Sequence, residues 1–295
     1  MDDEGAKWLT LEQQPVDLKQ VAELVNRLRR TITDTPTAAF PRFKVGTYLY
    51  LIGDFEAAAN ELKTAVSLDP ANAIIVAQLA KVLDLAGDHN EALAEFRHAI
   101  ELAPNLGEIH FLFAESLVRG ANISEAINQY RKAIAIKPDA QALSGLSEAL
   151  LSAGDAQGAI KASRQAVSVD PAVARAQVAL TNALLKSGDQ QSSLRTARQA
   201  ALLNPGMPES HMALGRCLFT KGDVSEAVEE FKQAVSLDPL NFQARNDLGY
   251  ALYGRGDILA AISEFRLALR INPHFTEARN NLEVAVHRLY GENKH

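Results

Sequence analysis

The chain has 295 residues, of which 47% are hydrophobic and only 6% aromatic, and its formal net charge is −6. A net negative charge gives no long-range attraction for phosphate backbones or anionic lipids, so neither nucleic acid nor a membrane is an expected partner. No stretch approaches 18 apolar residues, which excludes membrane insertion. The single cysteine, Cys217, excludes an intrachain disulfide framework and a multi-cysteine metal site. Because no basic and apolar leader opens the chain, we expect a cytoplasmic protein.

The first 36 residues are expected to form a tail and a degenerate capping helix. Val16 to Ile32 is amphipathic at helical spacing. Trp8 and Leu11 fall in register for a preceding helix, but Pro15 would break it. Residues 1–14 are therefore expected to be partly disordered.

Eight prolines then mark a fixed period along the chain. Each of the seven intervals is 34 residues, except one of 33 residues between Pro138 and Pro171. A period of this size indicates a repeat solenoid, which grows by adding units and does not enlarge a single core. The eight positions are Pro36, Pro70, Pro104, Pro138, Pro171, Pro205, Pro239 and Pro273.

A glycine-aspartate pair recurs between the prolines and predicts a tight turn between two helices. Glycine can take the left-handed conformation that ends one helix, and aspartate can cap the next. The third repeat departs from this pattern with Ala121-Asn122. Glutamates three residues after Asp88, Asn122 and Asp223 predict capping boxes there.

Small residues recur at one position in each half of the repeat, where they let two helix backbones approach. The first helices carry Gly46, Ala80, Ala114, Ser147, Thr181, Gly215 and Gly249, and the second helices carry Ala65, Ala99, Ala133, Ala166, Ala200, Ala234 and Ala268.

This combination of features resembles the tetratricopeptide repeat family: 34 residues, a leucine and a small residue in helix A, an alanine, an aromatic and an alanine in helix B, and a closing proline. The usual tryptophan near the start of helix A is absent, and Arg42, Val76, His110, Leu143, Gln177, His211 and Arg245 stand there. The resemblance implies an all-α, right-handed solenoid (superhelix) of helix-turn-helix units. Seven units are expected at 37–70, 71–104, 105–138, 139–171, 172–205, 206–239 and 240–273, followed by a capping helix and polar tail at 274–295.

The middle of the chain has no aromatic residue from Arg131 to Leu218, and Ser163 and Ala197 occupy the aromatic position of helix B. Less apolar area would be buried there. We therefore expect residues 139–205 to be the most compliant part of the solenoid.

No pattern in the sequence predicts catalysis or a bound cofactor. The seven histidines show no paired metal spacing, and no glycine-rich phosphate loop follows a strand. Cys217 stands alone among apolar residues, as a small buried hydrophobe would. We expect no enzyme activity, no cofactor and no metal.

The resemblance also implies a concave groove lined by the A helices, which would hold an extended peptide or a partner helix. Acidic residues are prominent at these positions in the first half of the chain, and basic and amide residues in the second half. The expected groove residues are Tyr50, Phe111, Glu115, Arg175, Asn182, Lys186, Met212, Arg216, Phe219, Asn246, Tyr250 and Tyr253.

The sequence favours a non-catalytic protein-interaction scaffold or adaptor that binds a protein segment in this groove. A solvated face of mixed charge is the alternative interpretation of the same residues. Three further functions stay open: self-assembly into a homo-oligomer, an accessory subunit of a transferase or other enzyme complex, and RNA binding. The acidic net charge and the 34-residue period count against RNA.

Overall fold

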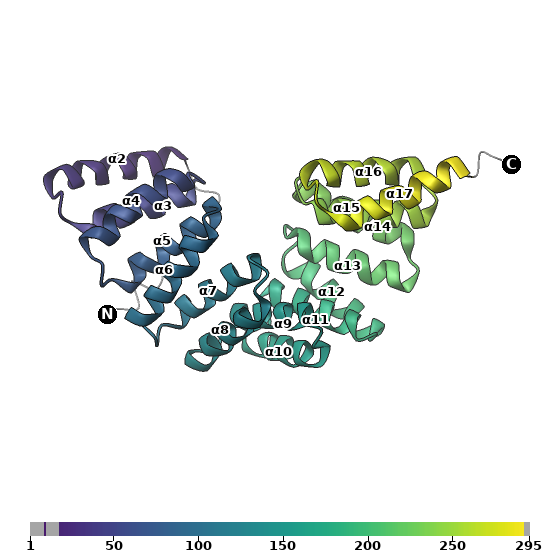
Figure 1. Ribbon diagram of the computed structural model, residues 1–295. Coiled ribbons are helices and arrows are strands. Elements are labelled where there is room, and N and C mark those ends of the chain that lie inside the picture. The colour runs from purple at the N-terminus through teal and green to yellow at the C-terminus, as the bar shows by residue number, and fades with distance from the viewer. Residues whose placement is uncertain (1–8, 10–17, 292–295) are drawn as a thin grey trace. The chain divides into compact units, whose positions relative to one another are not determined.

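The computed structural model describes Leu9 and residues 18–291, and this part of the chain contains sixteen helices and no strand (Figure 1). The expectation of an all-α fold is confirmed. The chain divides into two compact units, Met1–Ala149 and Leu150–His295. They are called here the N-terminal unit and the C-terminal unit.

The N-terminal unit is built from α2 (Leu18–Asp34), α3 (Ala39–Leu51), α4 (Phe55–Leu68), α5 (Ala73–Ala86), α6 (His89–Leu102), α7 (Gly107–Arg119) and α8 (Ile123–Ile136). The division falls within α9 (Ala140–Ser152). The C-terminal unit continues with α10 (Ala156–Val169), α11 (Ala174–Lys186), α12 (Gln190–Leu203), α13 (Pro208–Lys221), α14 (Val224–Leu237), α15 (Phe242–Arg255), α16 (Ile258–Ile271) and α17 (Thr276–Gly291).

From α3 onward the helices alternate in role. Odd-numbered helices are the A helices of the repeats, and even-numbered helices are the B helices. Each A helix in α3, α5, α7, α11, α13 and α15 packs on the B helix that follows it, and α3, α5, α11, α13 and α15 also pack on the next A helix. The side of the A helices that carries the expected groove residues is called here the A-helix face. The unit boundaries given above stay a prediction.

The turns between A and B helices have the left-handed geometry that the sequence predicts. Six glycines have positive φ, from +82° at Gly53 to +99° at Gly87. In the third repeat Ala121 takes this conformation itself, with φ of 57°. A left-handed alanine is strained because its Cβ lies too close to the following carbonyl oxygen.

The three expected capping boxes are not formed. The side chains of Asp88, Asn122 and Asp223 cap no backbone N–H. The Asn122 amide instead donates to Glu125 Oε2 at 2.9 Å, and the Asp223 carboxylate accepts from Lys221. Nothing in the structure explains the missing cap at Asp88. Three turns without a glutamate do have the bond: Asp54, Asp155 and Asp189 accept from the N–H groups of Ala57, Gly158 and Ser192.

The one short proline interval is explained by a loop. Three residues, Lys137 to Asp139, join α8 to α9, whereas four join every other B helix to the A helix that follows, as in 69–72. Asp139 ends the shorter loop by accepting from the Ala142 N–H at 2.9 Å. The fourth repeat is therefore one residue shorter in this loop and not in a helix, so α8 and α9 both keep their packing faces.

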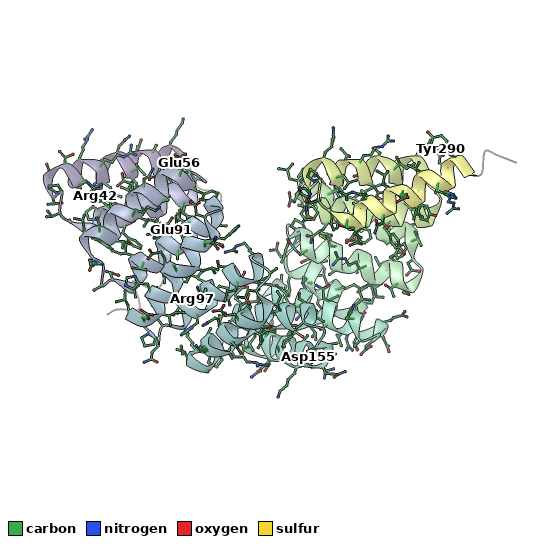
Figure 2. The ribbon with its side chains drawn as sticks, viewed as in Figure 1. Arg42, Glu56, Glu91, Arg97, Asp155 and Tyr290 are labelled. Carbon is green, nitrogen blue, oxygen red and sulfur yellow. The ribbon has the colours of Figure 1, made fainter. Side chains whose placement is uncertain are left out.

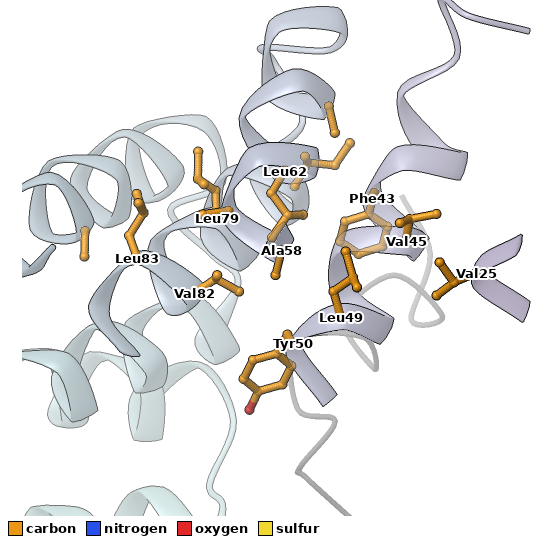
Figure 3. Packing of buried hydrophobic residues seen from close by; sticks show 14 of the residues in the cluster. Val25, Phe43, Val45, Leu49, Tyr50, Ala58, Leu62, Leu79, Val82 and Leu83 are labelled. Carbon is orange, nitrogen blue, oxygen red and sulfur yellow. The ribbon is translucent and has the colours of Figure 1, made fainter. Parts of the chain in front are cut away.

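Small residues of the A helices pack directly against large side chains of the B helices. A Cβ added to Gly249 would lie 2.6 Å from Phe265, and one added to Gly46 would lie 2.6 Å from Leu62. Figure 3 shows how Ala58 and Leu62 of α4 lie between residues of α3 and α5 in the first core cluster. The close approach that the sequence predicts at these positions is present.

In several repeats a polar side chain fills the position where the tryptophan of tetratricopeptide repeats is missing. His211 Nδ1 lies 2.7 Å from Glu230 Oε2 of the B helix, and its Nε2 lies 2.9 Å from the carbonyl oxygen of Pro205. Arg245 makes the equivalent pair of bonds, to Glu264 at 3.0 Å and to the carbonyl of Pro239 at 2.9 Å. Arg42, labelled in Figure 2, reaches Glu61 at 3.0 Å. Each side chain joins helix A to helix B, and His211 and Arg245 also reach the preceding proline loop.

At the N-terminus, α2 packs on α3 and contributes Val21 and Val25 to the first core cluster, as a capping helix would. The disorder expected for residues 1–14 lies outside the described residues, apart from Leu9. That residue is helical and fully buried. Within the described part of the chain, no helix combines the length and the apolar character needed to cross a membrane.

Replacing Ala121 with glycine should stabilise the protein by about 1 kcal/mol, because glycine adopts the left-handed conformation without the Cβ penalty. The matched control is Gly87→Ala, which has room for a Cβ but the same left-handed backbone, and should destabilise by a similar amount. Urea unfolding followed by circular dichroism measures both. A lower free energy of unfolding in Ala121→Gly would contradict the claim that the backbone of Ala121 is strained.

Replacing His211 with alanine should cost roughly 1–3 kcal/mol, because two hydrogen bonds between helices and loop are lost. His211→Arg should cost much less, since Arg245 makes the same two contacts one repeat later. Urea unfolding of the two variants is the measurement. An equal loss of stability in both variants would show that arginine cannot replace histidine at position 211.

Candidate functional site

In the C-terminal unit, nine of the expected groove residues lie on three successive A helices. Arg175, Asn182 and Lys186 are on α11, Met212, Arg216 and Phe219 on α13, and Asn246, Tyr250 and Tyr253 on α15. Because α11 packs on α13 and α13 on α15, these residues lie along one side of three adjacent helices, with Met212 and Asn246 buried beneath its surface. It is called here the C-terminal face.

An ion pair links two helices of this face. Arg216 Nε on α13 donates to Asp247 Oδ2 on α15 at 2.7 Å. Burial raises the pKa of Asp247, and the neighbouring Glu277 raises it further, although the Arg216 guanidinium acts to lower it. The cost of removing this carboxylate from water therefore exceeds what its cation returns.

A chain of amide contacts continues from α15 to α17. Asn246 donates through Nδ2 to Glu277 Oε1 at 3.1 Å, and its Oδ1 accepts from Asn281 Nδ2 at 2.9 Å. Asn246 itself is buried, whereas Asn281 is half-buried and Glu277 is exposed. Both hydrogen bonds join α15 to α17, so they fix the spacing of these two A helices.

Aromatic side chains lie beside the ion pair. The rings of Phe219 and Tyr250 are 5.2 Å apart, and Tyr250 is 50% exposed. Arg288 of α17 lies 5.1 Å from the Tyr253 ring. An open depression of 340 Å³ is lined by Tyr253 and Arg288 together with Glu283, Val284 and His287. The face thus offers cationic and aromatic groups over a short distance, whereas the Asn246 amide is buried.

Other expected residues are placed differently. Met212 is buried in a small cluster with Ala234 and Ala244, so it supports the face from within. Asn182 is half-buried, and Lys186 is exposed in the last turn of α11. Arg175 is half-buried in the first turn of the same helix. These α11 residues extend the face away from the ion pair.

The remaining three expected residues lie in the N-terminal unit. Glu115 accepts from the Tyr130 hydroxyl at 2.5 Å, and Phe111 lies 6.2 Å from the Tyr130 ring. Tyr50 is buried, and Lys81 lies 4.6 Å from its ring. The structure therefore brings Phe111 and Glu115 together around Tyr130, and it places Tyr50 with α5.

A buried carboxylate also links A helices in this unit. Asp84 of α5 accepts from Arg119 Nε of α7 at 2.6 Å and lies 2.8 Å from His89 Nδ1. Its side chain is fully buried. The acidic partner precedes the basic one here, whereas Arg216 precedes Asp247 in the C-terminal unit.

Sequence reasoning missed Asp247 and Asn281 as members of the C-terminal face. Asp247 follows directly after Asn246, a residue assigned to the face, and helical spacing of three or four residues passes over it. Asn281 lies on α17, outside the three helices of the expected face. The chemistry of these residues was the available signal. Asp247 is a carboxylate next to Asn246, and Asn281 is a second amide after Asn280; each lies about one repeat from a polar residue with which it can pair.

The described residues contain no group of three histidine, cysteine or carboxylate side chains that could hold a metal ion. Cys217 is buried, and this burial raises the pKa of its thiol. A raised pKa keeps a thiol protonated, which is unfavourable for a nucleophile.

Asp247→Asn should change how stability depends on pH. Because the folded-state pKa of Asp247 is raised, the wild-type protein loses stability as pH rises from the unfolded-state value, about 3.9, through the folded one. The variant lacks this loss, so its stability relative to wild type should increase over that interval. Urea unfolding between pH 4 and 8 measures the difference, and a constant difference would contradict the raised pKa.

Arg216→Ala should destabilise the protein at neutral pH by on the order of 1 kcal/mol, because it leaves the Asp247 carboxylate without its cation. The same substitution in an Asp247→Asn background should cost less. The double-mutant cycle isolates the coupling between the two side chains. Equal losses in both backgrounds would show that the pair is not coupled.

Comparison with known proteins places this fold. A family model described as tetratricopeptide repeat matches residues 46–106, 111–174, 178–241 and 221–274, which together cover about three quarters of the chain. No curated protein matches the chain.

Several solved structures share the fold at low sequence identity. The Cut9–Hcn1 hetero-tetramer of the APC/C matches with a TM-score of 0.68, 15% identity and coverage of 90% of this chain and 52% of that one. A tetratricopeptide repeat protein from Parabacteroides merdae matches with a TM-score of 0.70, 15% identity and coverage of 84% and 98%. Yeast Tom70 matches with a TM-score of 0.66, 16% identity and coverage of 99% and 65%.

This chain spans about half the length of the Cut9–Hcn1 chain it matches. The family match carries the assignment, and the solved structures support the fold. The repeat architecture is typical of protein–protein interaction scaffolds. The chain belongs to the tetratricopeptide repeat family.

Proposed function

We propose that the chain is a non-catalytic scaffold of the cytoplasm that binds a peptide segment or a partner helix on the C-terminal face. The observation that carries the proposal is the Arg216–Asp247 pair. Burial raises the pKa of Asp247 despite the adjacent guanidinium, so the ionised pair is costly for folding. Costly ionisable groups of this kind cluster at functional sites.

The chemistry of the face suits a peptide. Arginine and asparagine side chains can bind backbone carbonyls and carboxylates. Tyr250, half exposed beside Phe219, can pack against an apolar side chain. A ligand with an acidic or carbonyl group close to an apolar side chain would engage both kinds of group.

Reversing one charge and removing one ring should abolish binding without disturbing the helices. We expect Arg216→Glu with Tyr253→Ala to lose captured proteins that the wild-type chain retains, with unchanged helicity. The matched control is Arg266→Glu, which reverses an exposed arginine on α16, a B helix. Quantitative affinity capture from native lysate compares the three proteins. Equal capture by the double variant would place the binding surface elsewhere.

Self-assembly is the second candidate, because α17 exposes large apolar and aromatic side chains. Val284 is 54% exposed and Tyr290 is 65% exposed. Figure 2 shows Tyr290 near the end of α17. Light scattering over a range of concentrations tests this function. A mass that stays monomeric would exclude it.

A further inference from the structure

Leu9 contacts a helix that lies far along the chain from it. Its side chain is fully buried, and its carbonyl oxygen accepts from Lys81 Nζ on α5 at 2.9 Å. The contact joins residues 72 positions apart. Leu9 is therefore held against the second repeat.

Lys81 belongs to the A-helix face. It occupies the eleventh position of its repeat, the same position that Arg216 occupies in the C-terminal face. Its ammonium group also lies 4.6 Å from the ring of Tyr50, which corresponds in position to Tyr253. Figure 3 shows Tyr50 at the edge of the core cluster, beyond Leu49 and Val82. Leu9 thus lies on the N-terminal counterpart of the proposed binding surface.

A capping role does not account for this contact. The first repeat is already covered by α2, which packs on α3 through Val21 and Val25. A cap stacked ahead of α2 would lie farther from the second repeat than α2 itself. The nine Cα–Cα steps from Leu9 to the start of α2 at Leu18 can span up to roughly 30 Å, enough for a return across the first repeat.

The contact has the chemistry of peptide recognition. A cation binds a backbone carbonyl, and the adjoining apolar side chain is removed from water. Residues 1–17 contain five acidic residues and one lysine, so the segment is also attracted to a cation on the face. These are the groups that a peptide partner would present to Arg216 and Tyr253 in the C-terminal unit.

We propose that the segment carrying Leu9 occupies the A-helix face of the N-terminal unit as an intramolecular ligand, and that a leucine-bearing acidic peptide binds this face only after the segment leaves. This inference rests on the proposed function, because it assigns the same kind of ligand to the equivalent face. A short tether gives the segment an effective concentration in the millimolar range. A peptide of similar intrinsic affinity is then excluded at micromolar concentrations.

The accessibility of Lys81 tests whether the segment covers the face. Leu9→Asp should release the segment, because burying an aspartate in place of a leucine is unfavourable. We expect acetylation of Lys81 by an N-hydroxysuccinimide ester, followed by mass spectrometry, to be about tenfold faster in this variant, given the size of leucine burial. Leu202→Asp, at a leucine 81% exposed in the C-terminal unit, is the matched control and should leave the rate unchanged.

The rate at Lys186, an exposed lysine of the C-terminal unit, serves as the internal reference. Unchanged helicity by circular dichroism shows that the chain stays folded. Equal acetylation of Lys81 in wild type and Leu9→Asp would overturn the proposal.

Binding in trans tests whether the vacated face accepts a ligand. A fluorescent peptide of residues 1–17 should bind the full-length Leu9→Asp variant about tenfold or more tightly than the wild-type chain, because wild type holds its own segment there. The peptide carrying Leu9→Asp should not bind, and Lys81→Glu in the variant chain should abolish binding. Equal affinity for both full-length proteins, or no binding to the variant, would overturn the proposal.

The two proposals fail separately. The C-terminal face is tested with Arg216 and Tyr253, neither of which lies in the N-terminal unit. If Leu9→Asp leaves the acetylation rate of Lys81 unchanged while protein capture still depends on Arg216 and Tyr253, only the intramolecular ligand is rejected. The reverse outcome would reject only the C-terminal face.

Discussion

The first and the last two repeats depend on close contact between a small residue of helix A and a large residue of helix B. Gly249 has no room for a Cβ against Phe265, and Gly46 has none against Leu62. This contact fixes the distance between the two helices of a repeat and the rotation of each about its axis. The rotation of helix A in turn decides which of its side chains form the A-helix face, so the position of Arg216 follows from the packing at Gly215.

The fold could be predicted from the sequence because its determinants are local and repeated. A left-handed glycine, a closing proline and a small residue each act within one helix pair, and each recurs at a fixed interval. Two of the three capping boxes failed because polar side chains have several partners within reach: Asn122 bonds to Glu125, and Asp223 bonds to Lys221. The candidate site was predicted only in part for the same reason. Asp247 and Asn281 pair with residues 31 and 35 positions away, and no spacing within one helix reveals such a pair.

The polar contacts between A helices and those between A and B helices differ in character. His211 and Arg245 bond to a B-helix carboxylate and to a loop carbonyl, and they fill a position that packing would otherwise leave open. Asp247 lies on the A-helix face, and burial raises its pKa against the attraction of Arg216. The first kind of contact holds a repeat together. The second kind holds a polar surface in a fixed arrangement at a cost in stability.

The contact between Leu9 and Lys81 has a consequence for processing of the chain. The ten-residue stretch from Leu9 to Leu18 is the only covalent link between the buried leucine and the sixteen described helices. A protease that cleaved between these two residues would leave every described helix whole. It would also convert a tethered ligand into a free peptide, which dilution then removes. Cleavage at one site would thus make the N-terminal A-helix face available irreversibly, with no change to the solenoid.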